Sequence, residues 1–420
     1  MRLGETANDA AASYGKPLDG VRVLAAEQMQ ALPFATQLLA RLGAEVVKVE
    51  HPVHGESGRG SSPAMTDPQG RKVGATYLRN NLDKTSVGID LKAPEGRELF
   101  LAMAPRFDVI GENFKPGTMD RMGLGYEAIA AVHPRAIYVS ISGFGNGFAG
   151  LDPSPYTSWP AYASVVEAMS GIYEYKSGPA NPPTTIPMGA VGDISSALFG
   201  TIGVLAALRH RDRTGEGQYV DIAMLDAMIA MSDVVMNFWS LGVRPDPENA
   251  LAVICEGFRA SDGYVVIQVG REEQFFKLGE LIGRPGWRSD PRYATRDGWM
   301  PNLDREIRPA IEAWLVGRTK LQAAHELSSV GIVAGPSNSA PDLIADPHVA
   351  ARHMIVEMPR SDDGPDPVLI PGNPIKMSKV SEGPETRVPW VGEHTDEVLR
   401  AELGLDDADL TKLRDAGVIT

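Results

Sequence analysis

Cysteine, long apolar runs and a leader-like start are scarce or absent in this sequence. Cys255 is the one cysteine among 420 residues, which excludes a disulfide framework, a CxxC redox pair and a cysteine zinc cluster. We expect it to be a small buried residue rather than a nucleophile. No apolar run approaches the ~20 residues that span a bilayer, and the start of the chain lacks the apolar segment of a signal peptide. We therefore expect a cytoplasmic protein.

Basic residues are fewer than acidic ones, with 40 Lys and Arg against 54 Asp and Glu and a formal net charge of −14. This excess of negative charge argues against nucleic acid or a membrane surface as a partner. An anionic ligand is still compatible with the sequence if basic residues gather locally, and the alternative is that they are scattered surface charges. The local group consists of Arg71, Lys72, Arg79, Lys84, Lys92, Lys115 and Arg121.

The first 225 residues alternate strand-like and helix-like segments, which predicts an α/β fold with a mostly parallel sheet and helices on both faces. Strands are expected at 21–27, 44–50, 85–91, 108–114 and 136–145. Helices are expected at 31–43, 94–107, 118–134 and 194–211, the last with Arg209, His210 and Arg211 in its final turn. Ligands of such sheets bind beyond the carboxyl ends of the strands.

The pattern changes after residue 225, where a smaller α+β domain is expected. Residues 263–270 resemble one arm of an antiparallel pair, and 271–283, 301–317 and 319–332 are amphipathic helices. Residues 368–379 return to strand character, and 393–419 are helical. The predicted domains are 17–227 (large), 228–335 (small) and 336–420 (a return of the chain to the large domain).

Asp193 stands between Gly192 and an apolar run that ends at Leu208 and predicts a buried helix. Aspartate is a preferred N-cap residue, so one interpretation is that Asp193 caps this helix. The free N–H groups and the dipole of a helix start are expected to keep such a carboxylate ionised. An ionised carboxylate is also a possible nucleophile, and the two interpretations are compatible.

Several motifs of known chemistry are absent or incomplete. There is no P-loop, and the glycine-rich stretch 142–150 follows a strand without forming GxGxxG. The VSISG segment lacks the GxSxG pattern of a serine hydrolase. Residues 51–54 (HPVH), beside Glu50 and Glu56, lack a further convincing metal ligand. We expect no metal site and no permanently bound cofactor.

A set of segments, taken in order, resembles the family III CoA-transferases, the group of formyl-CoA transferase, carnitine CoA-transferase and α-methylacyl-CoA racemase. The resemblance runs from about residue 17 to 420. Its segments are KPLDGVRVL, LLARLGAEVVKVEHP, IDLKAPEGRE, ENFKPGTMDRMGLGYE, VSISGFG, GDISSALFGTIGVLAALRHRDRTGEGQYVDIAMLDA, ADPHVAAR and GEHTDEVL.

The resemblance implies a Rossmann-like large domain, a small domain and an interlocked homodimer. It also implies that CoA passes from an acyl-CoA to a small carboxylic acid, with Asp193 as the nucleophile. Asp193 would attack the thioester to give a mixed anhydride, and the CoA thiolate would return to form an aspartyl-CoA thioester. The backbone N–H groups at the helix start and in SGFG would stabilise the oxyanions.

The motifs of the family also imply a set of CoA contacts. They are Gln30 and Ala31 near the thioester, Ile89 and Lys92 near the adenine, Asn113, Phe114 and Arg121 in ENFKPGTMDR, and Lys115 as a further phosphate ligand. Two positions depart from the formyl-CoA enzyme, because an Arg is His51 here and a Lys is Ser142 here. The glycine-rich loop of that enzyme has no counterpart near 249–258, which argues against formate or oxalate as substrate.

Two other functions remain open from the sequence. A 2-methylacyl-CoA racemase needs a base on each face of the α-carbon, in this family a His and the same Asp. The stretch between SGFG and Gly192 contains no histidine. Tyr162 and Glu167 are possible substitutes, although aromatic packing and a solvated helix face are their simpler interpretations. The other alternative is a CoA-binding homologue without catalytic activity.

Overall fold

The computed structural model describes residues 1–147, 152–173, 182, 189–233, 235–244 and 253–420. The chain forms two compact units, Met1–Lys176, Pro182–Leu241 and Ala351–Thr420 in the first and Ser177–Asn181 and Gly242–Ala350 in the second. These limits differ from the sequence-based limits of 228 and 335. The helix α9 (Met224–Met231) packs on helices of the first unit, so the first unit extends beyond residue 228.

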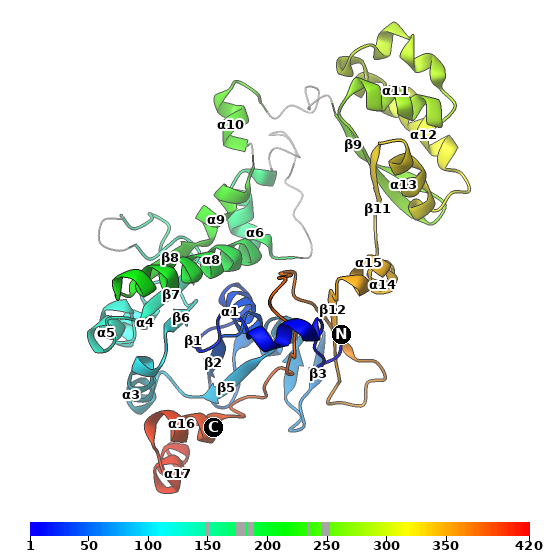
Figure 1. Ribbon diagram of the computed structural model, residues 1–420. Helices are drawn as coiled ribbons and strands as arrows, with labels where there is room; N and C mark the ends of the chain where they lie inside the picture. Colours follow the sequence, from blue (N-terminus) through cyan, green and yellow to red (C-terminus); the bar gives the residue numbers. More distant parts are fainter. Residues whose placement is uncertain (148–151, 174–181, 183–188, 234, 245–252) are drawn as a thin grey trace. The chain divides into compact units, whose positions relative to one another are not determined.

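Six strands form the central sheet of the first unit, in the order β5-β2-β1-β6-β7-β8 (Figure 1). They are β1 (Arg22–Ala26), β2 (Glu45–Glu50), β5 (Lys84–Gly88), β6 (Val109–Glu112), β7 (Ile137–Ser142) and β8 (Gln218–Ala223). All neighbours pair in parallel, which confirms the predicted sheet. The strand order reverses between β1 and β6, where sheets of this kind bind ligands.

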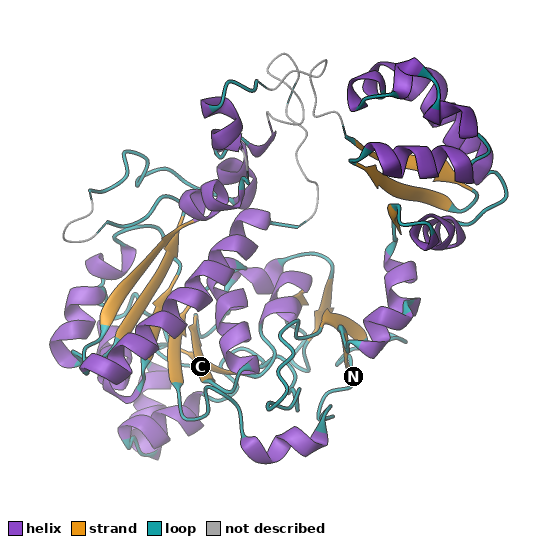
Figure 2. Ribbon diagram, turned by 45° about the horizontal axis from the view of Figure 1, so that its top comes forward, coloured by secondary structure: helices purple, strands orange, loops and turns teal. Residues whose placement is uncertain are grey.

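Helices cover both faces of this sheet (Figure 2), so its strands are buried on both sides. Val23 and Ala25 pack toward α1 and α8, whereas Leu24 and Ala26 pack toward α3 and the C-terminal helices. The helices of the first unit are α1 (Ala31–Arg41), α2 (Ala75–Asn80), α3 (Pro94–Met103), α4 (Thr118–Arg121), α5 (Tyr126–Val132), α6 (Ala163–Met169), α8 (Val191–Thr214), α9, α10 (Val235–Ser240), α16 (Thr395–Leu403) and α17 (Asp407–Asp415).

Two segments expected to be continuous helices are broken by glycine. The 118–134 segment divides into α4 and α5 around Gly123, and the 393–419 segment divides into α16 and α17 at Gly404. Both glycines adopt positive φ, 72° and 71°, a conformation that ends a helix and that glycine adopts without steric cost. The strand expected over 368–379 is also shorter, since β13 (Val368–Pro371) pairs only with β12 (Ile355–Met358).

Helix α8 has 24 residues and continues past Arg211, which was expected in its last turn, to Thr214. By length and composition it is apolar enough to cross a membrane, contrary to the sequence-based expectation, but half of its most apolar window is buried inside the protein. The central helix of a soluble protein passes the same test. Here α8 packs along α1, α6, α9, β7 and β8.

The C-terminal segment completes the first unit next to β5. The N–H of Asp90 donates to the carbonyl of Val418 (2.8 Å), and the N–H of Thr420 donates to the carbonyl of Gly88 (3.2 Å). A further small hairpin joins β3 (Ala64–Thr66) to β4 (Lys72–Gly74). The ends of the chain therefore belong to the same unit as the parallel sheet.

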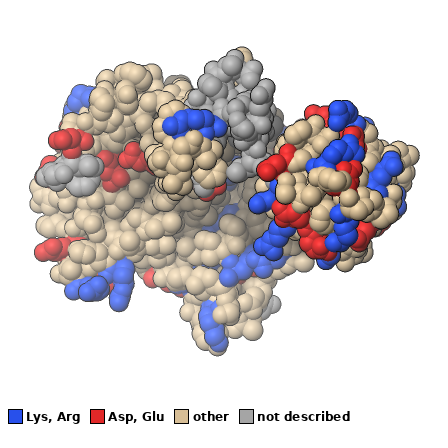
Figure 3. Space-filling view, turned by 90° about the horizontal axis from the view of Figure 1, so that it is seen from above, with Lys and Arg blue, Asp and Glu red and all other residues tan. Residues whose placement is uncertain are grey.

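The second unit is an antiparallel sheet covered by helices. Its strands lie in the order β11-β10-β9, and Phe275 stacks between Trp287 and Trp299 in its core. Cys255 lies on β9 and is exposed, not buried as expected. Acidic and basic atoms alternate over the surface of this unit (Figure 3). Its elements are β9 (Ile254–Ala260), β10 (Gly263–Val269), α11 (Glu272–Leu281), α12 (Arg308–Leu315), α13 (Lys320–Ser329), β11 (Val333–Pro336), α14 (Ala340–Ala345) and α15 (Pro347–Ala351).

Candidate functional site

Asp193 lies in the first turn of α8 and does not cap it. The helix begins at Val191, its N-cap is Ala190, and no side-chain cap hydrogen bond is present. Helix α8 ends just before β8 begins at Gln218, so the C-terminal end of α8 lies at the amino edge of the sheet. The N-terminal end of this long helix, which carries Asp193, therefore reaches the carboxyl edge. The cap interpretation of Asp193 is therefore wrong, while its expected place at the carboxyl edge agrees with the structure.

Glu167 of α6 provides the missing hydrogen bond. Its Oε1 accepts the N–H of Gly192 at 3.0 Å, and its Oε2 accepts the hydroxyl of Tyr173. The side chain is buried, with 3% of the residue exposed, so the expected solvated helix face is wrong for Glu167. Tyr162 is also unlike its prediction, because 74% of it is exposed.

Gly192 is needed where α6 meets α8. A Cβ at this position would lie 2.8 Å from Cγ2 of Val166 and 3.0 Å from the Cα of Ala163, closer than packed atoms approach. The carbonyl of Gly192 accepts the hydroxyls of Ser195 (3.1 Å) and Ser196 (2.5 Å). Both polar groups of this glycine are therefore held, which fixes the backbone that leads into Asp193.

The Asp193 carboxylate is half-buried and has no hydrogen bond or ion pair to a described residue. Burial raises its pKa to about 6 from the usual 3.8, and the negative charge of Glu167 adds to this effect. The predicted ionised state holds at neutral pH, but the environment disfavours it. A carboxylate with a raised pKa is a better nucleophile than an ordinary one once it is ionised.

A cavity of about 310 Å³ lies at the carboxyl ends of β5, β2, β1 and β6, next to the reversal of strand order. Three of the predicted CoA contacts line it: Ile89, Lys92 and Phe114. His51, one of the two departures from the formyl-CoA enzyme, also lines this cavity. The structure therefore brings the two predicted adenine-side residues, Ile89 and Lys92, together with Phe114 of a separate motif.

The other predicted contacts have different surroundings. Asn113 is hydrogen-bonded to the backbone of Gln28 in both directions, at 2.9 Å each, which ties the end of β6 to the loop after β1. Gln30 is the half-buried N-cap residue of α1, and Ala31 is buried. Lys115 and Arg121 are exposed, and Arg121 donates to the hydroxyl of Thr118.

The basic group expected between residues 71 and 121 is only partly available to a ligand. Lys84 is buried against Glu27 at 2.7 Å, and Arg71 is paired with Asp67. Arg79 lies over the ring of Phe34. Lys92, Lys115 and Arg121 remain exposed for an anion.

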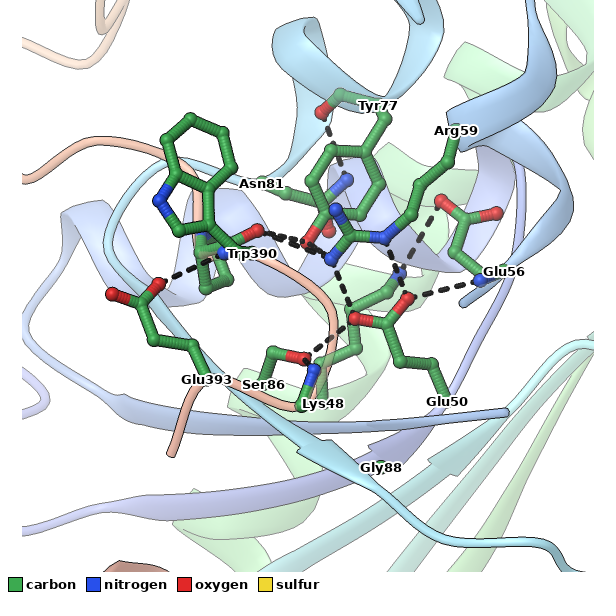
Figure 4. Close-up of polar contacts among 12 residues, drawn as sticks. Lys48, Glu50, Glu56, Arg59, Tyr77, Asn81, Ser86, Gly88, Trp390 and Glu393 are labelled. Atoms are coloured by element: carbon green, nitrogen blue, oxygen red, sulfur yellow. Dashed lines mark hydrogen bonds and ion pairs between the residues drawn. The ribbon is translucent and has the colours of Figure 1, made fainter. Parts of the chain in front are cut away.

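Beneath the cavity lies a buried ionic network (Figure 4). Arg59 makes a two-pronged contact with Glu50, at 2.8 Å and 2.6 Å, and its guanidinium lies 3.7 Å from the ring centroid of Tyr77. Lys48 lies 3.5 Å from both Glu27 and Glu56. Burial alone would raise the pKa of Glu27 and Glu50, but the neighbouring cations lower both below the usual value.

The network also holds the loop that enters α1. Met29 adopts a left-handed φ of 59°, and its N–H donates to Oε2 of Glu56 at 2.8 Å. A non-glycine residue adopts this conformation only where its surroundings fix it. The charged residues below the cavity therefore position the Gln28–Gln30 segment, whose sequence matches the predicted thioester contact.

These contacts bear on two other features of the region, the HPVH segment and the SGFG loop. Glu50 and Glu56 bind Arg59 and Lys48 rather than turning toward the HPVH histidines, and no group of three potential metal ligands occurs among the described residues. In the SGFG loop, the N–H of Gly145 donates to the hydroxyl of Ser142 at 3.0 Å. This N–H is consequently not available to an oxyanion, although the loop was expected to supply such donors.

A larger cavity of about 660 Å³ lies beside β6, β7 and β8 and is lined by Glu112, Tyr138 and Tyr219 among others. Burial raises the pKa of Glu112 to about 8, despite its hydrogen bond from the N–H of Phe114. None of the predicted site residues lines this cavity. It therefore lies outside the candidate site.

Comparison with known proteins gives one consistent result. The model of CoA-transferase family III matches residues 18–395. The succinyl-CoA:mesaconate CoA-transferase of Haloarcula hispanica is 35% identical over 398 residues, which cover 93% of this chain and 96% of that protein. The formyl-CoA:oxalate CoA-transferase of Streptomyces coelicolor is 34% identical over 430 residues and covers 96% of this chain and 99% of its own.

Solved structures agree with the sequence comparison. A CaiB/BaiF family protein from Brucella suis superposes with a TM-score of 0.79 at 32% identity, covering 93% of this chain and 100% of that one. A protein of Mycobacterium tuberculosis superposes with a TM-score of 0.74 at 29% identity, covering 91% of this chain and 99% of its own.

Proposed function

The chain belongs to CoA-transferase family III and moves CoA from an acyl-CoA to a carboxylic acid, and on this premise we propose that Asp193 is its nucleophile. One observation carries the proposal. Asp193 is desolvated at the start of α8 without capping the helix. A carboxylate in this position costs stability, and reaction with a thioester explains why it is present.

The reaction then proceeds by exchange at three carbonyl carbons, those of the donor acyl group, of Asp193 and of the acceptor. A carboxylate oxygen of Asp193 attacks the thioester carbon, the C–S bond breaks, and a mixed anhydride and CoA thiolate result. The thiolate attacks the aspartyl carbonyl, which releases the donor acid and leaves an aspartyl-CoA thioester. The acceptor carboxylate displaces the thiolate again, and the thiolate takes the new acyl group. Asp193 is regenerated as a carboxylate, so no oxidant or metal enters the balance.

The start of α8 supports the charge that forms in each step. The N–H groups of Val191 and Asp193 lie in the first turn and have no described hydrogen-bond acceptor. Such groups favour a developing oxyanion, and the helix dipole acts in the same direction. This part of the expected oxyanion site remains available, unlike the N–H of Gly145.

For CoA itself, we propose that the 310 Å³ cavity takes the adenine end through Ile89, Lys92 and Phe114. Arg121 and Lys115 are exposed on and before α4, whose Thr118 lines the same cavity, so they are placed to bind the phosphates. Gln30 and Ala31 begin α1, which packs along α8. This arrangement supports a role near the thioester, with Asn113 holding the loop from below.

The acceptor is proposed to be a small dicarboxylic acid. The relatives are named for mesaconate, malate, citramalate and oxalate. His51, Ser142 and the absent glycine-rich loop argue against oxalate here. A screen should therefore begin with succinyl-CoA and C4–C5 dicarboxylates and detect each new thioester by mass spectrometry.

A homodimer is the remaining part of the proposal. The first unit exposes large apolar side chains on α8 (Leu198 and Ile202), on α9 (Met231), on α10 (Met236) and at the N-cap of α6 (Tyr162). A partner subunit is the simplest cover for such a face. Analytical ultracentrifugation down to nanomolar protein should show no monomer, and a monomer that forms reversibly on dilution would contradict the interlocked architecture.

The experiment that tests the nucleophile is trapping of the intermediate. Protein mixed with succinyl-CoA, or with the best donor from the screen, should carry a CoA-sized adduct on the peptide that contains GDISSALFG. Hydroxylamine should discharge it. An adduct on Cys255 instead would remove Asp193 from the mechanism. In D₂O, a 2-methylacyl-CoA should show no α-proton washout, because Glu167 is already bound to Gly192 and Tyr173.

A further inference from the structure

We propose that Glu167 is a positioning residue for Asp193: it caps α8 in the place of Asp193 and holds a second negative charge beside it. This inference rests on the proposed role of Asp193 as the nucleophile. Glu167 is 26 residues before Asp193 in the sequence and lies on a different helix.

Both oxygens of the Glu167 carboxylate are engaged. Oε1 accepts the N–H of Gly192, and Oε2 accepts the hydroxyl of Tyr173, which is itself buried. At its own backbone, the carbonyl of Glu167 accepts the hydroxyl of Ser170 at 2.7 Å. Hydrogen bonds thus fix both the backbone and the side chain of Glu167. Its carboxylate cannot turn toward a substrate without breaking its two hydrogen bonds, to Gly192 and to Tyr173.

The packing of α6 against α8 makes this cap possible. Gly192 has no side chain, so Val166 and Ala163 approach its Cα closely and bring Glu167 within 3.0 Å of the N–H. An N-terminal N–H of a helix needs an acceptor when it is buried. With Glu167 in this role, neither oxygen of Asp193 is used for capping, and a lone pair remains free to attack a carbonyl carbon.

Glu167 is the one described group whose charge acts on Asp193. The elements packed on α8 carry the following other titratable side chains: Arg41 on α1, Tyr138 on β7, Tyr219 and Asp221 on β8, and Asp226 on α9. None of them is a cause of the shift at Asp193, which comes first from burial and then from Glu167. Removing the charge of Glu167 should therefore make Asp193 a weaker base.

The test uses Glu167→Gln, which keeps an oxygen acceptor for Gly192 but removes the charge. The readout is the infrared band of the protonated Asp193 carboxyl, isolated by subtracting the spectrum of the same protein carrying Asp193→Asn. The pH at which this band has half its full intensity, the midpoint of the titration, should lie near pH 6 in the unaltered chain and at lower pH in Glu167→Gln. Asp226→Asn is the matched control, because it removes an exposed carboxylate next to α8 and should leave the midpoint unchanged.

A second variant tests the cap. Glu167→Ala removes the acceptor, so amide hydrogen exchange in a peptide covering 189–196 should become at least ten-fold faster, whereas Glu167→Gln should retain the slow rate. Turnover at high pH should fall at least ten-fold in Glu167→Ala and only a few-fold in Glu167→Gln.

Equal midpoints in the unaltered chain and in Glu167→Gln would overturn the inference, as would an equal shift in Asp226→Asn. Complete loss of turnover in Glu167→Gln with adduct formation retained would also overturn it, in favour of proton transfer by Glu167. These titrations require no substrate. They therefore separate a failure of this inference from a failure of the proposed function, which appears as unaltered turnover in Asp193→Asn.

Discussion

Two sets of buried carboxylates in the first unit differ in what surrounds them. Glu27, Glu50 and Glu56, beneath the 310 Å³ cavity, lie against Lys48, Lys84 and Arg59. Glu167 and Asp193, at the start of α8, have no ion pair with a described Lys or Arg. The pKa of Glu27 and of Glu50 is consequently lowered, and the pKa of Asp193 is raised.

The difference shows how burial has opposite effects on a carboxylate depending on its partners. A buried acid with a cation stays ionised and holds its neighbours, as Glu56 holds Met29. A buried acid next to another acid keeps its basicity, which favours nucleophilic attack and disfavours stability. In the proposed function, the first set supports the Gln28–Gln30 loop and the second set supplies the nucleophile.

The largest effect is expected from Asp193→Asn. Asparagine has the same shape, but an amide does not attack a thioester at a useful rate, so turnover should fall by several orders of magnitude. Because Asp193 does not cap α8, the variant should fold and bind CoA. Steady-state rates and CoA calorimetry measure the two properties. Normal turnover in Asp193→Asn would show that the second set, like the first, does not supply the nucleophile.

Lys84→Met should have the largest effect on stability. It leaves Glu27 buried without its 2.7 Å partner, and breaking one side of a buried pair costs about 3–5 kcal/mol. Arg400→Met, which removes an exposed ion pair with Asp407 in the same unit, should cost less than about 1 kcal/mol. Chemical denaturation measures both. Equal losses would show that the buried network is no more important than a surface pair.

Arg121→Ala should weaken CoA binding by about 1–3 kcal/mol, the scale of a hydrogen bond to a charged group. Arg106→Ala is the control, since Arg106 is also exposed but precedes β6, at the opposite edge of the sheet. Calorimetry with CoA measures the change. Unchanged affinity in Arg121→Ala would leave Arg121 as a surface residue without a role in CoA binding.

The smallest effect is the pH dependence of stability. The pKa of Asp193 is about 6 in the folded chain, above its usual 3.8, so its charge costs stability above pH 6 and this cost disappears as the pH falls toward 4. Asp193→Asn should be more stable than the unaltered chain by about 1 kcal/mol at pH 7.5. The difference should shrink as the pH falls below 6 and be lost once the pH is below 3.8, as denaturation experiments can measure. A constant difference would assign it to packing rather than to charge.

The sequence alone determined the parallel sheet and the family, and it singled out Asp193 as the residue proposed to be the nucleophile. Alternating strand and helix patterns are local, because a strand buried on both faces such as β1 must be apolar along its length. The resemblance to the family implied Ile89, Lys92 and Phe114 as CoA contacts, and the structure brings these three into one cavity. The helix breaks at Gly123 and Gly404 were visible as glycines, although their effect was not predicted.

The tertiary structure decided which charged groups meet. The sequence predicted a solvated helix position for Glu167, but α6 packs on Gly192 and buries it. It placed Lys84 among the residues for an anionic ligand, but Lys84 binds Glu27, which lies 57 residues earlier in the sequence. Such pairs leave no periodic signal, because the contact depends on how elements pack and not on spacing within one element. Burial and the charge of its neighbours together decide whether a carboxylate forms ion pairs that hold the structure or keeps a raised pKa. For that reason the sequence indicated Asp193 as a possible nucleophile, but only the packing of α6 against α8 showed that Glu167 caps its helix.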